Sequence, residues 1–257
     1  MQKILLFMLA LISISCQEVR LVQPEDITES EQTGSVVPVS EGEKVVHTYY
    51  QLAYSEEHEG ALWVYYHLTP EFTNGTAERK DNFKEDPLVS TGSATLEDYK
   101  GSGYDRGHLC PAASMTINQT AMDESFYLSN MSPQHPSLNR GRWKSLETAV
   151  RDWVNEKGEL HVVSGAIYNT LIEVIGPEKV SVPARYYKVI WDGESQMLGF
   201  MLPNEKCPNE LGFYAVPVDS IEQLTGIDFF SIVPDQLENK IEAENNYSTW
   251  MNSLTLN

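Results

Sequence analysis

Three side chains in the middle of the chain, His108, Asn139 and Glu147, are of types that could together cut a phosphodiester bond. Such hydrolysis needs a base for water, a cation beside the phosphorus-bound oxygens, and a group that eases the departure of the leaving oxygen. A histidine with its unperturbed pKa of about 6.5 is a suitable base at neutral pH. Asn139 offers one neutral oxygen, which would leave most of a cation's shell to water and phosphate, as is usual for Mg²⁺. These residues predict a site that binds one cation weakly until an anionic substrate arrives.

The residues just before His108 suit the same chemistry. Arg106 carries a planar fork of donors that matches a phosphate better than a lysine would. Gly107 has no Cβ, so backbone or substrate could approach it closely. We assign Asp105 to holding the turn rather than to catalysis.

The spacing of Asn139 and Glu147 predicts that one helix carries both. Apolar residues recur at helical intervals through residues 140–154, at Trp143, Leu146, Val150, Trp153 and Val154. Eight residues advance a helix by about 800° and about 12 Å, so both side chains can border one cleft. At that separation we expect Glu147 to reach a cation through water rather than directly.

Each of these residues also has a simpler interpretation when it is taken alone. Asn139 fits a helix cap, and His108 fits a hydrogen-bonded structural histidine. Glu147 fits a solvated helix residue, and Arg106 fits one half of a surface ion pair. The functional interpretation therefore depends on the combination of residues.

The combination resembles the sequence signature of the DNA/RNA non-specific endonucleases. The chain carries Asp-Arg-Gly-His at residues 105–108, Asn-Met-Ser-Pro-Gln at residues 130–134, and Asn139, Trp143 and Glu147 at intervals of four. The elements stand in the family's order and spacing, and a weaker likeness extends over residues 45–230. The tetrapeptide alone would be a weak signal, whereas the whole set is highly specific.

The resemblance implies a ββα-metal finger, with the histidine on a strand and the asparagine on the helix. It implies a metal-dependent endonuclease that hydrolyses DNA and RNA with Mg²⁺ or Mn²⁺ and leaves 5′-phosphate and 3′-hydroxyl ends. By this resemblance His108 is the general base and Asn139 the metal ligand, while Arg106 and Glu147 assist at the phosphate and the metal's waters. Asn130 helps to set the site and is assigned to the substrate-binding group.

Arg79 is assigned to the same group on a looser match. Residues 79–83, Arg-Lys-Asp-Asn-Phe, resemble the family's segment that brings another arginine to the phosphate. The flanking residues match only in part, and an exposed loop arginine explains Arg79 equally well.

The remaining sequence pattern predicts an α+β fold with a mostly antiparallel sheet. Residues 50–54 and 62–68 are rich in aromatic and β-branched side chains and predict a strand pair. Residues 160–164, 185–191 and 197–202 predict buried strands, and residues 220–224 a short helical turn. Strands in series with helices inserted between them are typical of this fold class.

The two ends of the chain predict segments outside the endonuclease domain, which we place at residues 45–235. Residues 4–12 form an apolar run that follows Lys3, too short for a membrane span of about 20 residues, so residues 1–15 predict a signal peptide. Residues 16–44 are acidic and predict a disordered tether. Residues 236–257 predict a polar tail that docks on the surface or frays.

The end of the apolar run also predicts where the protein is found. Ser15-Cys16 resembles a bacterial lipoprotein cleavage site, although Ser13 departs from its usual pattern and leaves simple cleavage and release open. We therefore expect an exported protein in the bacterial periplasm, on the outer membrane or outside the cell. Any contact with a membrane would run through a lipid on Cys16.

The net charge of −19 argues against tight binding of nucleic acid by the molecule as a whole, because phosphate neutralisation supplies most of that affinity. The predicted helix is locally basic, with Arg140, Arg142, Lys144 and Arg151, and a nuclease needs turnover rather than tight binding. We expect DNA and RNA to be bound weakly and with a marked dependence on salt.

Two other function classes remain open at this point. One is a nucleic-acid-binding lipoprotein that has lost cleavage. The other is a zinc hydrolase of a non-nucleic substrate, with His108, Cys110, His135 and Cys207 as its ligands, although their spacing does not match known zinc motifs. Cys110 and Cys207 could instead form a disulfide, but sequence cannot place their Cα atoms within the required distance of about 4.4–6.8 Å. The oligomeric state is not indicated.

Overall fold

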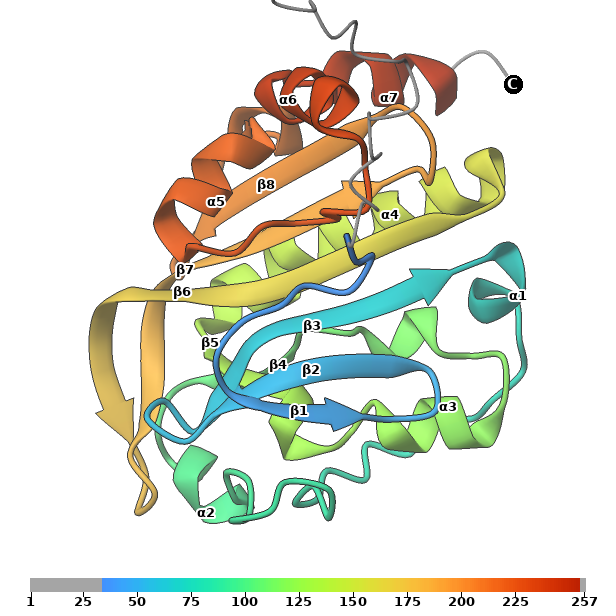
Figure 1. Cartoon of the computed structure of the whole chain (residues 1–257). Helices are drawn as coiled ribbons and strands as arrows, with labels where there is room; N and C mark the ends of the chain where they lie inside the picture. The colour runs from blue at the N-terminus through green and yellow to red at the C-terminus, as the bar shows by residue number, and fades with distance from the viewer. Residues whose placement is uncertain (1–33, 255–257) are drawn as a thin grey trace, which may run out of the picture. The chain divides into compact units, whose positions relative to one another are not determined.

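A seven-stranded antiparallel sheet forms the centre of the computed structural model, which describes residues 34–254 (Figure 1). The strand order is β1-β2-β3-β6-β7-β8-β9. The strands are β1 (Glu43–Val46), β2 (Tyr50–Ser55), β3 (Gly60–Leu68), β6 (Leu160–Ile175), β7 (Val180–Trp191), β8 (Met197–Pro203) and β9 (Ala215–Val216). This sheet confirms the predicted α+β class and each of the strands expected from the sequence.

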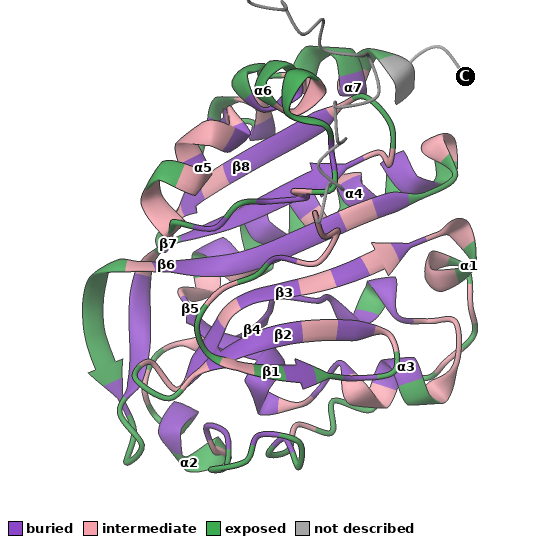
Figure 2. Cartoon of the chain, viewed as in Figure 1, coloured by how far each residue is buried: buried purple, intermediate pink, exposed green. Residues whose placement is uncertain are grey.

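Neighbouring side chains on a strand point to opposite faces of the sheet. Both faces are apolar here, and each is covered by different helices. Val162 and Tyr186 lie in the core that includes helix α4 (Lys144–Lys157), whereas Val163 and Tyr187 lie in the core with α5 (Val218–Thr225) and α6 (Asp235–Ala243). Both cores are closed to solvent, and the strands between them are largely buried in Figure 2. The sheet is therefore the middle of three layers.

A second, two-stranded sheet lies in the layer that contains α4. It pairs β4 (Asp105–His108) with β5 (Met131–Gln134) in antiparallel register. A π-helical turn, η4 (Leu138–Trp143), leads from β5 into α4. Two strands followed by a helix are the arrangement that the ββα-metal finger predicts.

Short elements connect these parts. They are α1 (Pro70–Thr73), α2 (Leu96–Tyr99), η2 (Ala112–Ser114), α3 (Gln119–Glu124), η3 (Leu128–Asn130) and η5 (Leu211–Tyr214). Among the helices of residues 34–254, none has the length and apolar character that crossing a membrane requires.

The C-terminal segment is part of the folded body, which corrects the predicted polar tail at residues 236–257. It forms α6 and α7 (Tyr247–Leu254). Ile241 and Trp250 are buried, and the ring of Trp250 meets that of Trp153 on α4 edge to face, with 5.3 Å between centroids. The prediction weighed the polar residues of these helices and missed the few apolar ones that anchor them.

The folded body also begins earlier than residue 45. Val36 and Val37 pack against the core under α5 and α6, and Pro38 is buried. These contacts shorten the predicted tether of residues 16–44. The predicted signal peptide, Cys16 and the rest of the tether lie outside the described residues.

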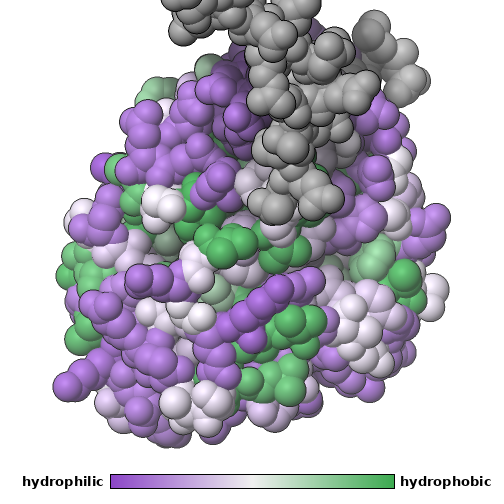
Figure 3. Space-filling view, viewed as in Figure 1, coloured by the Kyte–Doolittle hydropathy of each residue, from purple (hydrophilic) through white to green (hydrophobic). Residues whose placement is uncertain are grey.

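The face of the molecule seen in Figure 3 is mostly hydrophilic, with its hydrophobic residues in separate small patches. The layer with β4, β5 and α4 lies behind the sheet in this view (Figure 1).

Candidate active site

Strand β4 places Arg106 and His108 on one side and Gly107 on the other, because side chains alternate along a strand. The Gly107 side is filled by the chain itself. A Cβ at residue 107 would lie 2.3 Å from Oε1 of Gln134, the β5 residue that packs there. Glycine is therefore needed for packing between the two strands. A side chain fills the space in which we expected backbone or substrate to approach.

Trp143 joins the start of the helix to β4. Its indole is fully buried, and its Nε1 donates a hydrogen bond to the backbone carbonyl of His108 at 3.1 Å. The helix before it is not regular, because Gly141 has φ −109° and ψ −107°. The predicted continuous helix through residues 140–154 is thus interrupted, and Asn139 precedes the break whereas Glu147 follows it.

Asp105 orients the side chain of Asn139. Its Oδ2 accepts a hydrogen bond from Nδ2 of Asn139 at 2.9 Å. Because an ionised carboxylate only accepts hydrogen bonds, this contact fixes the amide with its nitrogen toward Asp105 and its oxygen away from it. Arg140 closes the arrangement with two hydrogen bonds to the same carboxylate, at 2.6 and 2.8 Å. Burial alone would raise the pKa of Asp105, but the bonds from Arg140 and Asn139 lower it below its ordinary value.

The predicted residues line one cavity of about 280 Å³. Five of the six site residues predicted from the sequence border it, and Asn130 does not. The lining also brings in basic side chains from both strand and helix, so that five cations face one carboxylate. The charged and polar lining comprises Arg79, Arg106, His108, Asn139, Arg140, Lys144, Glu147 and Arg151. The cavity is therefore locally positive in a chain whose net charge is −19.

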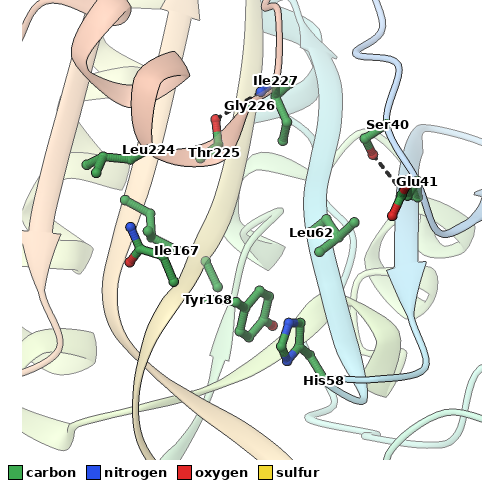
Figure 4. Close-up of a pocket in the computed structure, with 12 residues that line it drawn as sticks. Ser40, Glu41, His58, Leu62, Ile167, Tyr168, Leu224, Thr225, Gly226 and Ile227 are labelled. Carbon is green, nitrogen blue, oxygen red and sulfur yellow. Dashed lines mark hydrogen bonds between the residues drawn. The ribbon is translucent and has the colours of Figure 1, made fainter.

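A larger cavity of about 580 Å³ lies on the sheet face that carries α5 (Figure 4). Its walls include Leu62 of β3, the stacked rings of His58 and Tyr168, Thr225 at the end of α5, and Ile227 in the loop that follows. None of the six predicted site residues lines it. Its size does not make it the better candidate, because it lacks the convergent cations that a phosphate would need.

His108 sits in an apolar, electropositive setting. Its ring meets Phe126 edge to face, with 5.0 Å between centroids, and its Nε2 is buried without a hydrogen-bond partner. Burial, together with the nearby guanidinium groups of Arg79 and Arg106, lowers the pKa of His108 to about 3. The imidazole is therefore neutral at pH 7 and free to accept a proton, but it does not titrate near 6.5 as we expected from the sequence.

The charge of Glu147 interacts with that of a buried lysine, Lys188, which the sequence interpretation missed. Lys188 of β7 is fully buried, and its Nζ donates hydrogen bonds to Tyr66 at 3.1 Å and to Ser164. Burial raises the pKa of Glu147 and lowers that of Lys188, and the opposite charge of each group counters the shift of the other. The lysine thus supports the ionised form of Glu147 from inside the core. A lysine within the apolar run at residues 185–191 was the signal that could have revealed it.

Arg151 also belongs to the cavity and was noted from the sequence only as part of a basic helix. It stands one turn after Glu147, and its Nη2 donates to Thr148 at 2.9 Å. Its Nη1 is buried and has no hydrogen-bond partner. A buried guanidinium nitrogen without an acceptor at the edge of a cavity is suited to an incoming anion.

Two aromatic rings position the remaining arginines. The guanidinium carbon of Arg106 lies 4.2 Å from the centroid of Phe83, and that of Arg79 lies 5.2 Å from the centroid of Phe126. Arg79 is exposed and paired with Asp81 at 2.7 Å, whereas Arg106 has no carboxylate partner in the described part of the chain. Arg106 is therefore the freer of the two to bind a phosphate.

Asn130 is buried in the wall behind the site. Its Oδ1 accepts from the backbone N–H of Cys110, and its Nδ2 donates to the carbonyls of Cys110 and Ser125, all between 2.8 and 2.9 Å. With no exposed surface it cannot contact a substrate here. This corrects its assignment to substrate binding and leaves it a role in holding the segment that follows His108.

The structure does not bring together the residues proposed as ligands for zinc. Within residues 34–254, the one group of three or more histidine, cysteine and acidic side chains placed to hold a metal is elsewhere, and it contains none of His108, Cys110, His135 and Cys207. Cys110 and Cys207 are both free and buried, so they do not form the disulfide that the sequence left open.

Comparison with known proteins identifies the family. The family described as DNA/RNA non-specific endonuclease matches residues 29–236. The chain belongs to the DNA/RNA non-specific endonuclease family. It is thus a member of a nuclease family, as the order of its motifs predicts.

Individual relatives agree with this membership of the DNA/RNA non-specific endonucleases. "Endonuclease G, mitochondrial" of Homo sapiens is 36% identical over 200 residues, which cover 70% of this chain and 67% of that protein. "Nuclease" of Nostoc sp. is 33% identical over 215 residues, 78% of this chain and 77% of that protein. "Mitochondrial nuclease" of Saccharomyces cerevisiae is 35% identical over 208 residues, 70% of this chain and 63% of that protein. The chain thus spans about two thirds of the mitochondrial relatives.

A solved structure shows the same fold. The crystal structure of the EndoG/EndoGI complex, titled as a mechanism of EndoG inhibition, matches with a TM-score of 0.72 and 31% sequence identity. The match covers 77% of this chain and 89% of that one.

The names of the relatives correct the predicted location. The sequence was interpreted as that of a protein exported to the bacterial periplasm, the outer membrane or the outside of the cell. Several similar nucleases, among them those of Homo sapiens and Saccharomyces cerevisiae, are named as mitochondrial. The prediction was therefore wrong. It depended on an N-terminal apolar run and on Cys16, and neither belongs to the described residues.

Proposed function

We propose that the chain is an endonuclease that hydrolyses DNA and RNA with one divalent cation, Mg²⁺ or Mn²⁺, and leaves 5′-phosphate and 3′-hydroxyl ends. The observation that carries the proposal is the Asp105–Asn139 hydrogen bond, which directs the amide oxygen of Asn139 away from Asp105 in a cavity that His108 and Glu147 also line.

The donors at this cavity fit a hard cation. Asn139 offers an amide oxygen of the kind that Mg²⁺ and Mn²⁺ prefer, and the carboxylate of Glu147 can bind the water in the cation's shell. The surrounding cations would repel a bare metal ion, so we expect tight binding only together with the phosphate. When bound, the metal would supply a Lewis acid that draws charge from the phosphate and the leaving oxygen.

The chain's own groups then have separate tasks. His108, neutral at pH 7, takes the proton from the attacking water. Arg106 binds a non-bridging phosphate oxygen with its fork of donors, and Arg151 offers its unpartnered Nη1 to the same anion. Glu147 holds and orients water, in the ionised form that Lys188 favours.

Contacts with phosphate rather than with bases explain why no sequence preference is expected. The charged lining is dominated by arginine and lysine, which bind the backbone that all sequences share. We assign Arg79 to contact with the nucleic-acid backbone. Its guanidinium is exposed, and a phosphate of the substrate would compete with Asp81 for it. Cleavage should therefore weaken strongly as salt rises.

The test is incubation of the full chain with supercoiled plasmid and with single-stranded RNA, with Mg²⁺ or Mn²⁺ and with chelator. We expect cleavage of both substrates with metal and none with chelator. His108→Ala should lower turnover by a factor of about 10²–10⁴. His67→Ala, which removes a partly exposed histidine from β3, is the matched control and should leave turnover unchanged. Intact plasmid in every divalent metal would refute the proposal.

Asn139→Ala should behave differently from His108→Ala. It removes an oxygen that holds the cation, so the metal concentration needed for half-maximal rate should rise as well as the rate fall. If Asn139→Ala lowered the rate with an unchanged metal dependence, Asn139 would not be the ligand.

A further inference from the structure

A second group of carboxylates converges far from the cavity described above. The ligand oxygens of Asp219, Glu222 and Glu242 all lie within 4.8 Å of one another. Asp219 and Glu222 stand one turn apart on α5, and Glu242 lies near the end of α6. Both helices cover the sheet face opposite α4, so the whole sheet separates this group from His108 and Asn139. Figure 1 shows α5 and α6 in front of the strands and α4 behind them.

Glu242 has no partner for its charge. It is 4% exposed, and its Oε1 is buried with no hydrogen-bond donor. An unpaired buried carboxylate is costly because it has lost its water and gained nothing in exchange. This carboxylate lies beside those of Asp219 and Glu222, and three negative charges so close together would repel one another.

The surroundings supply no compensating cation. Across residues 34–254, no lysine, arginine or histidine forms an ion pair with any of the three carboxylates. Their charged neighbours are Glu238 and Asp228, which add to the repulsion. Glu222 has one hydrogen bond, in which its Oε1 accepts from the backbone N–H of Phe229 at 2.8 Å.

We propose that Asp219, Glu222 and Glu242 bind a hard divalent cation, with calcium as the ion whose size fits best, and that this ion joins α5 to α6. Two ligands of one calcium ion stand at most about 4.6–5.2 Å apart, twice the usual Ca–O distance, which agrees with oxygens that lie within 4.8 Å. Magnesium would require them within about 4.2 Å, and it is usually held by only one or two carboxylates, whereas calcium accepts several in a flexible geometry. The absence of histidine and cysteine from the trio disfavours zinc and copper.

The ion would act on stability rather than on catalysis. Asp219 and Glu222 are half-buried, so water can complete its coordination shell. Because α6 follows the loop after α5, a bond between the two helices would fix the C-terminal part of the body against the sheet. The site makes no contact with the cavity that carries the proposed nuclease chemistry, and it holds whether or not that proposal does.

The test uses the full chain with Asn139→Ala, which removes the other proposed metal ligand and so isolates this site. After treatment with chelator, free calcium at a hundred times its dissociation constant should raise the melting temperature by about 5–10 °C. Adding Glu242→Gln should abolish the shift. Glu244→Gln removes an exposed carboxylate two residues away and is the matched control, in which the calcium shift should persist.

Direct binding completes the test. Calorimetry should find one calcium per chain in Asn139→Ala and none after Glu242→Gln, with Asp219→Asn as a second variant should Glu242→Gln fold poorly. Binding of Mg²⁺ or Mn²⁺ as well as calcium still supports a hard-cation site, whereas binding of zinc alone overturns it. No calcium shift in Asn139→Ala, or an equal shift after Glu242→Gln, also overturns it. Glu242→Gln in the otherwise natural chain should cleave plasmid at the natural rate.

Discussion

The amide of Asn139 is held by Asp105, whose Oδ2 lies 2.9 Å from Nδ2 of Asn139. The aspartate stands at the first position of β4, and the asparagine in the turn before α4. This bond connects the strand that carries His108 to the residue proposed to hold the cation. An acidic residue that we assigned to the turn therefore decides which atom of Asn139 is available to a metal.

Replacing Asp105 with asparagine tests this relationship. The new amide can present either its oxygen or its nitrogen, so it no longer fixes which end of Asn139 turns away. We expect Asp105→Asn to lower activity about 10–100-fold and to raise the metal concentration for half-maximal rate. The measurement is rate against magnesium concentration. Asp152→Asn, an exposed change on α4, is the control, and similar behaviour of the two variants would contradict the orienting role.

The buried state of His108 predicts a pH dependence of folding. Its pKa is about 3 in the folded chain and about 6.5 when unfolded, so between these values only the unfolded chain binds the proton. Stability is therefore fully present above pH 6.5 and is lost as pH falls toward 3. At pH 4.5 we expect His108 alone to have cost about 2–3 kcal/mol.

Urea unfolding at pH 7 and pH 4.5, in chelator, measures this effect. Glutamine cannot take up a proton, so His108→Gln should lose clearly less stability between the two pH values than the natural chain. His67→Gln, at a partly exposed position, should lose as much as the natural chain. Equal losses in the natural chain and in His108→Gln would show that His108 is not buried in its neutral form.

Much of the fold was predictable because its signals are local. Strands were predicted by alternating and β-branched segments. The helix that borders the cavity was predicted by apolar residues at helical intervals through residues 140–154. Arg106 and His108, which stand in one short motif, were also predicted together, and both line the cavity.

What escaped prediction depends on contacts between distant segments. Asn130 was assigned to substrate binding from the sequence, yet its amide forms hydrogen bonds with three backbone groups. Lys188 lies 41 positions after Glu147, and only the packing of β7 under α4 brings their charges together. Trp250 anchors a segment whose average composition is polar. Each of these cases depends on the burial of a single residue, which the average composition of a segment does not reveal.

Lys188 should act on the reaction through Glu147. Lys188→Met keeps a similar shape but removes the buried cation, so the pKa of Glu147 should rise further and less of it should be ionised at pH 7. A shift of one pKa unit would lower the rate below that pKa by roughly tenfold. The rise of kcat/KM with pH should therefore move to higher pH, and activity should recover under alkaline conditions. Lys206→Met, at an exposed site, should leave the profile in place.

A loss of activity in Lys188→Met that alkaline pH did not restore would assign Lys188 to folding alone. Removing one member of a buried pair of opposite charges is destabilising, by about 3–5 kcal/mol, because the other charge loses its compensation. The pH profile is therefore measured on Lys188→Met under conditions in which urea unfolding shows that the variant is folded.

Trp143 and Trp153 form a matched pair on the same helical segment. Both are fully buried, but Nε1 of Trp143 donates to the carbonyl of His108 at 3.1 Å, whereas Nε1 of Trp153 has no hydrogen-bond partner. Phenylalanine keeps most of the packing at either position and removes the N–H. Trp143→Phe leaves a buried carbonyl unsatisfied next to the proposed base, which costs about 1–3 kcal/mol beyond the change in packing.

We expect Trp143→Phe to lower turnover because His108 loses the bond that holds its backbone, and Trp153→Phe to retain turnover at a comparable loss of packing. Trp143→Ala should cost about 3–5 kcal/mol of stability, since it also leaves a cavity. Urea unfolding and plasmid cleavage, measured on the same preparations, separate the two effects. Equal turnover in the two phenylalanine variants would show that the bond to His108 supports the fold but does not position the base.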